Sequence, residues 1–127
     1  MSVPAAPVQQ QRWLPPSPGL LKINVDGALA KNRYGGAVAA LCRDEHGTYL
    51  GSSAVVFRGT RDPIMLETFA CREALALAYD LDIQNMEVAS DCLEVVKDIK
   101  EGRGGPNAAI IQEIATRRSS YISSSFI

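Results

Sequence analysis

The sequence predicts an α/β domain built around a mixed sheet. Three apolar segments with short connections come first, at 20–28, 37–44 and 48–57, and they are typical of an antiparallel meander. Helical periodicity replaces the strand pattern after Asp62. Because this helix runs back along the sheet, the apolar strand at 86–90 should be parallel to the first strand.

The meander is predicted from its strands and turns. The first strand, LLKINVDGA, places Ile23 and Val25 on one face. A polar turn, KNRYGG, leads to the second strand, AVAALCRD. The sequence EHG favours a tight hairpin into the third strand, TYLGSSAVVF.

The second half of the sequence alternates helices with strands. Asp62 suits the N-cap of the first helix and Pro63 its first position. After the strand at 86–90 come the helix CLEVVKDIKEG, which should end at Gly102, and the helix NAAIIQEIATRRSS. The segment YISSSFI (121–127) is the start of a fifth strand that we expect to be incomplete.

The amino-terminal segment differs in composition from the rest. Residues 1–18 hold five of the seven prolines and show no periodicity, so we expect a flexible, Pro-rich leader from which Trp13 docks. The folded domain should then span 19–127. A hydrophobic content of 46% suits one soluble globular domain of this length.

Charge and cysteine usage exclude several classes of protein. A net charge of −1 argues against a strongly basic nucleic-acid-binding arm. The three cysteines lack CxxC spacing, which favours reduced thiols in the cytosol or nucleus over a disulfide framework or a zinc site. The sequence contains neither a membrane span nor a secretion signal. We therefore expect an intracellular protein that is not secreted, and we expect it to be a monomer.

Three acids should meet at one edge of the sheet. Asp26 ends the first strand, Asp91 ends the fourth, and Glu67 lies near the start of the first helix. The carboxyl ends of parallel strands share an edge, and the helix begins at that edge. Converging carboxylates repel one another unless a cation neutralises them, and hard divalent metal ions prefer oxygen ligands. The trio therefore indicates a metal-dependent phosphodiester-cleaving domain.

Each acid also has a structural interpretation. Asp26 precedes Gly27, and this pair is a common turn former. Glu67 could favour the dipole of its helix. Asp91 fits a D-x-x-E capping box with Glu94. Their joint placement at one edge is what favours a shared site.

Basic residues should surround these acids. The loop with Lys31 and Arg33 and the loop with Arg58 and Arg61 belong to the same edge, where they would form a nucleic-acid-binding rim. His46 belongs to the hairpin turn at the opposite edge and should be exposed to solvent.

Two arginines of the last helix have a simpler interpretation than a nucleic-acid patch. Arg117 and Arg118 are expected to form a solvated face of that helix.

Three motifs resemble those of plant ribonuclease-H-like domains, which occur alone or at the end of retroelement reverse transcriptases. They are DGA closing the first strand, E-x-x-A-x-x-x-A-L in the helix, and S-D-C-x-x-V-V after the fourth strand. The similarity covers residues 13–127. The separations of 41 residues (26 to 67) and 24 residues (67 to 91) suit the first three catalytic acids of the family.

The resemblance implies a five-stranded mixed sheet flanked by helices and hydrolysis of the RNA strand of RNA–DNA hybrids. It implies that Asp26, Glu67 and Asp91 are catalytic and bind Mg²⁺ or Mn²⁺ in a two-metal site, with Asp26 as the bridging ligand. The hybrid would be recognised by its shape and its 2′-hydroxyls, with phosphate contacts from the basic rim.

The sequence departs from the family pattern at its end. That pattern finishes with a fourth acid in an A-D-x-L-A-type helix, often near a histidine-bearing loop, whereas this sequence stops at Ile127. We therefore expect a domain that lacks its C-terminal helix and an activity impaired by the missing acid. The alternative is a catalytically degenerate ribonuclease-H-like module that binds nucleic acid or a protein partner.

Overall fold

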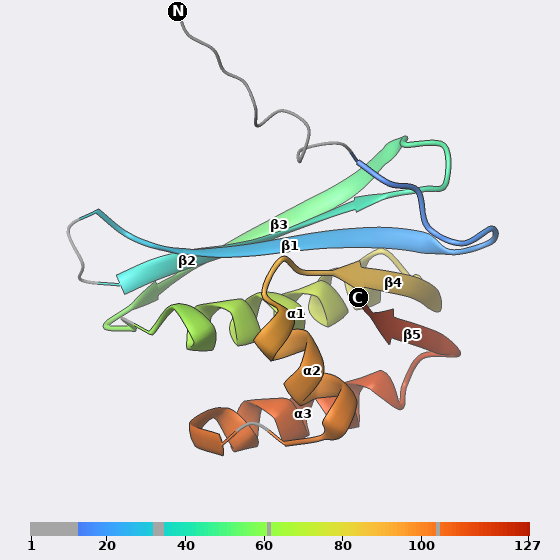
Figure 1. Cartoon of the computed structure of the whole chain (residues 1–127). Coiled ribbons are helices and arrows are strands. Elements are labelled where there is room, and N and C mark those ends of the chain that lie inside the picture. The colour runs from blue at the N-terminus through green and yellow to red at the C-terminus, as the bar shows by residue number, and fades with distance from the viewer. Residues whose placement is uncertain (1–12, 32–34, 61, 104) are drawn as a thin grey trace, which may run out of the picture.

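A five-stranded mixed sheet with the strand order β3-β2-β1-β4-β5 organises the chain (Figure 1). The computed structural model describes residues 13–31, 35–60, 62–103 and 105–127. Figure 1 shows the α-helices gathered on one side of the sheet, below it in this view. The α/β class expected from the sequence, with a mixed five-stranded sheet, is confirmed.

The sheet combines an antiparallel and a parallel half. The strands are β1 (Leu21–Leu29), β2 (Gly35–Arg43), β3 (Tyr49–Arg58), β4 (Asn85–Ala89) and β5 (Ser123–Phe126). The first three form the expected antiparallel meander. Strand β4 runs parallel to β1, with Ile23 opposite Val88, and β5 runs parallel to β4. The carboxyl ends of β1 and β4 therefore lie at the same edge.

Within the described residues, three α-helices and one short turn of 3₁₀-helix accompany the sheet. They are α1 (Pro63–Asp80), α2 (Leu93–Glu101), η2 (Gly105–Asn107) and α3 (Ala108–Arg118). Asp62 is the N-cap of α1, as expected, because its side chain accepts a hydrogen bond from the Ile64 N–H at 2.9 Å. Gly102 ends α2 with a φ of 74°, a conformation that glycine adopts without strain.

The core lies between the sheet and α1. Ile23 and Val25 share the buried face of β1, as the alternation predicted, and are 0% and 8% exposed. They meet Leu66 and Ala70 of α1, which are also buried. Each fully buried aliphatic side chain contributes ~1.5–3 kcal/mol of transfer free energy, so this layer fixes α1 against β1.

The part of the expected leader that the structure describes contacts the sheet. Lys22 donates from Nζ to the carbonyl of Leu14 at 2.8 Å, and the same nitrogen lies 6.0 Å from the centre of the Trp13 ring. Ser17 donates to Glu87 at 3.1 Å. Residues 1–12 of that leader lie outside the described residues.

The turn between β2 and β3 lies at the end of the sheet away from Asp26. Its tight geometry comes from Asp44, whose Oδ1 accepts from the N–H groups of His46 and Thr48 at 2.9 Å each. His46 is exposed there, as expected. None of the helices that the structure describes is both long and apolar enough to cross a membrane.

Candidate functional site

Glu67 joins three parts of the fold at the carboxyl edge of β1 and β4. Its Oε1 accepts a hydrogen bond from the backbone N–H of Gly27 in β1 at 3.2 Å. Its Oε2 accepts one from the hydroxyl of Ser90, between β4 and α2, at 3.4 Å. Both carboxylate oxygens are therefore engaged by donors that come from distant parts of the sequence.

Gly27 is the residue that lets α1 approach β1 at this point. A Cβ atom at Gly27 would lie 2.9 Å from the carbonyl carbon of Leu66 and 3.0 Å from its oxygen. Both are backbone atoms of α1 and cannot rotate away. The missing side chain therefore brings the strand N–H within reach of Glu67.

Glu67 occupies an electrostatically costly position. Burial raises the pKa of its carboxyl group above the usual value, and the negative charges of Asp26 and Asp91 raise it further. The hydrogen bonds from Gly27 and Ser90 oppose this shift because they stabilise the charged form. Since both aspartates act on Glu67, the three acids occupy one electrostatic neighbourhood.

Asp26 lies on β1 opposite Ala39 of β2, and its side chain is exposed. The strand continues past it as far as Leu29. The interpretation of Asp26 and Gly27 as a turn pair is therefore wrong. The glycine serves a close helix–strand contact inside a regular strand.

The structural interpretations of the other two acids also fail. The first turn of α1 contains no acidic residue, because Glu67 lies in the turn that follows, so a role in compensating the helix dipole is not supported. Asp91 is exposed and precedes the N-cap of α2, which is Cys92. The Cys92 N–H donates to the Ser90 hydroxyl at 3.1 Å, so the expected capping box from Asp91 is wrong.

The donor chemistry of this edge fits a hard divalent cation, because all three side chains offer carboxylate oxygens. The mutual repulsion at Glu67 is of the kind that a bound cation relieves. Within the described ranges, however, no group of three or more His, Cys, Asp or Glu side chains is close enough to hold a metal ion as the side chains stand.

The expected basic rim is described in part. Lys31 follows β1, and Arg58 ends β3 opposite Gly35, so both lie beyond Asp26 at the same end of the meander. Both side chains are exposed. Arg33 and Arg61 lie outside the described residues.

Two residues of this site were not assigned a role from the sequence. Gly27 supplies a backbone donor to Glu67. The sequence feature that could have indicated this role is the position of a glycine inside an apolar strand, where another segment of backbone can approach closely. Ser90 supplies a hydroxyl that donates to Glu67 and accepts from Cys92. Its only signal was its place directly before Asp91 in the S-D-C motif.

Three solved structures with the same fold are described as ribonucleases H. Ribonuclease H1 of the halophilic archaeon Halobacterium salinarum superimposes with a TM-score of 0.76 at 18% identity, covering 86% of this chain and 84% of that one. LC11 ribonuclease H1, in complex with an RNA/DNA hybrid, gives a TM-score of 0.72 at 19% identity, with 84% and 83% covered. The N-terminal ribonuclease H domain of a Mycobacterium tuberculosis protein gives 0.71 at 17% identity, with 84% and 81% covered.

A comparison with curated proteins yields no significant match. A family model, however, matches most of the sequence. The family model described as reverse transcriptase-like matches residues 24–126, which include all three acids and every strand from β2 to β5. The chain therefore has the ribonuclease H fold and belongs to the reverse transcriptase-like family.

Proposed function

We propose that this domain acts as a type 1 ribonuclease H, which hydrolyses the RNA strand of RNA–DNA hybrids with divalent metal ions. The observation that carries the proposal is that three carboxyl groups share one sheet edge, where burial raises the pKa of Glu67 and the charges of Asp26 and Asp91 raise it further. Acids brought together in this way are suited to binding hard cations. The shared fold supports the substrate class, since one protein with this fold was solved with an RNA/DNA hybrid.

The three acids have complementary places in this proposal. Asp26, Glu67 and Asp91 would hold Mg²⁺ or Mn²⁺, and a two-metal site supplies an activated water and a stabilised leaving oxygen when it is occupied. Glu67 is held from both sides by Gly27 and Ser90. The side chains of Asp26 and Asp91 are exposed and remain accessible from solvent.

The basic rim would bind the hybrid through its phosphates. Lys31 and Arg58 are exposed at the end of the meander beyond Asp26, and Arg33 and Arg61 adjoin them in the sequence. Side chains of this kind neutralise phosphates and make binding sensitive to salt. The choice of an RNA strand would rest on the 2′-hydroxyls.

A cleavage assay on an RNA–DNA hybrid with Mn²⁺ or Mg²⁺ tests the proposal. The parent should cleave the RNA strand, Asp26→Asn should lose this activity, and a chelator should abolish it. Asp82→Asn is the matched control, because Asp82 follows α1, is exposed, and has a φ of 57° that asparagine also tolerates. Absence of metal-dependent cleavage by the parent would overturn the enzyme assignment.

The second candidate is a module that binds hybrids without cleaving them. It is favoured by the finding that, in the described part of the chain, no three potential ligands stand close enough to hold a metal ion. Binding of a labelled hybrid by the parent, unchanged by chelator and without cleavage, is the result that this candidate predicts.

A further inference from the structure

The two outermost strands of the sheet, β3 and β5, differ in length and in surroundings. Strand β5 has 4 residues, whereas β3 has 10. Among the described residues, no strand pairs with the side of β3 that faces away from β2. This side of Tyr49–Arg58 is called the β3 margin below.

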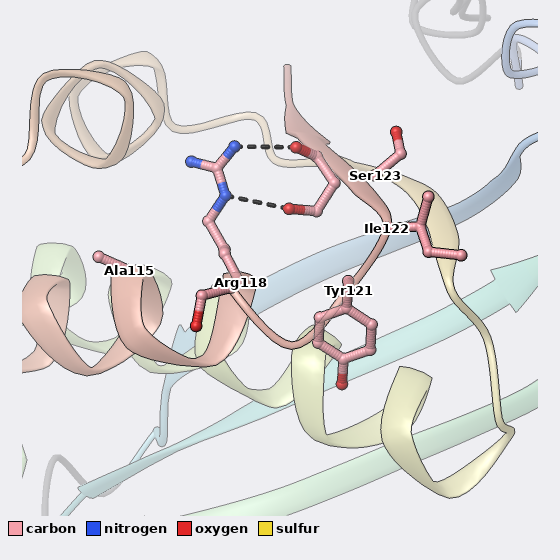
Figure 2. A pocket seen from close by; sticks show the side chains of 7 residues that line it. Ala115, Arg118, Tyr121, Ile122 and Ser123 are labelled. Atoms are coloured by element: carbon pink, nitrogen blue, oxygen red, sulfur yellow. Dashed lines mark hydrogen bonds between the residues drawn. The ribbon is translucent and has the colours of Figure 1, made fainter.

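An arginine engages the main chain of β5. Arg118 donates from Nε to the hydroxyl of Ser124 at 3.0 Å and from Nη2 to the carbonyl of the same residue at 2.8 Å, as the dashed lines in Figure 2 show. Its guanidinium carbon also lies 5.1 Å from the centre of the buried Phe126 ring. The expectation that Arg118 belongs to a solvated face is therefore wrong. A strand as short as β5, with one main-chain acceptor already bonded to a charged side chain, is a poor template for a further strand.

The β3 margin lacks the features that usually prevent an outermost strand from pairing with another chain. Such strands are kept short or carry proline or charged residues, above all lysine. The sequence of β3, YLGSSAVVFR, contains no proline, and its only charged residue is Arg58, at the last position. The register with β2 shifts between Cys42 and Arg43, near the start of β3, and is regular from Gly51 onward. From Gly51 to Arg58, alternate residues therefore turn their N–H and C=O groups away from β2, toward solvent.

Side chains on the inner face of β3 hold the strand against α1. The Ser53 hydroxyl donates to the carboxylate of Glu73, and the Phe57 ring stacks on the Phe69 ring with 4.4 Å between their centres. Glu73 and Phe69 both belong to α1. Because the backbone of β3 is already ordered by these contacts, pairing with another strand would cost it little further conformational entropy.

The exposed side chains of β3 are largely apolar. Tyr49, Leu50 and Val56 are 57%, 39% and 73% exposed, and Ala54 is exposed as well. A strand that pairs along the β3 margin places its own side chains beside these residues. Part of this apolar surface then leaves water, which favours the pairing.

A second copy of this chain is the partner that best matches the β3 margin. Two copies of one strand pair in the antiparallel sense about a twofold axis, and such a contact closes on itself. With the axis near Ala54, the two copies of Arg58 lie at opposite ends of the paired strands, so like charges do not face each other. A net charge of −1 adds little long-range repulsion between the copies.

We propose that two copies of this chain associate by antiparallel pairing of their β3 strands, which joins the two sheets into one. The association differs from the monomer expected from the sequence, and it is weak, since one strand pair covers less area than a standard interface. The acidic edge stays uncovered, because β1 and β4 lie beyond β2 as seen from β3. The association is thus independent of the proposed hydrolysis, and the two proposals can fail separately.

Sedimentation equilibrium of the whole chain over a range of concentrations, without nucleic acid, tests the proposal. The average mass should rise with concentration from 13.7 kDa toward twice that value and not beyond it. Hydrogen–deuterium exchange at the β3 amides should be slower at high protein concentration than at low concentration, because pairing protects the amides that face away from β2.

Ala54→Lys is the variant that should weaken the association. Ala54 is exposed, so the lysine should keep the fold, but two like charges then meet near the twofold axis and should weaken the association by ~5-fold or more. Ala37→Lys is the matched control, because Ala37 is also exposed and lies opposite Val56 on β2, which takes no part in the pairing. This control adds the same charge to the same face of the sheet and should leave the association nearly unchanged.

Three outcomes would overturn the proposal. The first is the mass of one copy at every concentration, and the second is growth beyond two copies, which indicates an open-ended contact. The third is equal weakening by Ala37→Lys and Ala54→Lys, which would place the contact on the face of the sheet and not at the β3 margin. The exchange measurement uses the parent protein, so it decides the question even if Ala54→Lys fails to fold.

Discussion

The backbone N–H of Gly27 donates to Oε1 of Glu67 at 3.2 Å, and this bond joins β1 to α1 across 40 residues of sequence. The bond requires the strand and the helix to lie closer than a side chain at position 27 would permit. The position of a candidate catalytic acid is thereby tied to the packing of the core.

Gly27→Ala should destabilise the fold and displace Glu67. The new methyl group would meet backbone atoms of Leu66 at 2.9 and 3.0 Å, so the helix must move, at a cost of ~1–3 kcal/mol. Gly51→Ala is the matched control, because its methyl group would meet only the flexible side chain of Leu81 at 3.0 Å. Urea unfolding measures the free energy of unfolding of both variants. Equal losses of unfolding free energy in the two variants would contradict this account.

Ser90→Ala should cost both stability and activity. The change removes a hydroxyl that donates to Glu67 and accepts from the Cys92 N–H. Leaving these two partly buried partners without that hydrogen bond should cost ~1–3 kcal/mol. Ser90→Thr keeps the hydroxyl and should restore most of the loss. Ser52→Ala, which removes an exposed hydroxyl bonded to Tyr49, should change the unfolding free energy by less than ~0.5 kcal/mol. A threonine variant as defective as the alanine variant would argue against the hydrogen-bonding role.

Much of this fold could be predicted because its local signals agree with its packing. Alternation at Ile23 and Val25 marked the buried face of β1, and Asp62 with Pro63 marked the start of α1. Short turns fixed the antiparallel meander, and one helix crossing fixed the direction of β4.

The details of the site could not be predicted, because they depend on contacts between distant segments. Gly27 follows an aspartate, and an Asp-Gly pair favours a turn. The sequence does not show that α1 packs closely against Gly27 within a continuous strand. The capping box expected of Asp91 is absent because the N-cap of α2 is Cys92, which makes no side-chain cap hydrogen bond and whose N–H donates to the Ser90 hydroxyl. The helical pattern could not show that Arg118 is partly buried, because its hydrogen bonds to Ser124 and its contact with Phe126 cross from α3 to β5.

The stability of the chain should depend on pH through Glu67. Its pKa in the folded protein is raised, chiefly by burial, above the ordinary value of 4.5. A carboxyl group with a raised pKa in the folded state stabilises the fold below its ordinary pKa, and this contribution is lost as the pH rises through the folded value. In a chelator, Glu67→Gln should therefore gain stability relative to the parent as the pH rises through that window. A difference in unfolding free energy between the two proteins that stays the same at every pH would contradict the prediction.

Lys31 and Arg58 should contribute to hybrid binding through phosphates alone. Both are exposed beyond Asp26, so removing either should weaken binding of every sequence alike and lower the salt-dependence slope by ~1. Arg43→Gln is the matched control, because Arg43 ends β2 at the other end of the meander, opposite Lys22. Filter binding of a labelled hybrid to catalytically silenced Asp26→Asn protein, at a series of salt concentrations, gives the slopes. A slope that Lys31→Ala and Arg58→Ala leave unchanged, or that Arg43→Gln lowers equally, would place the hybrid elsewhere on the molecule.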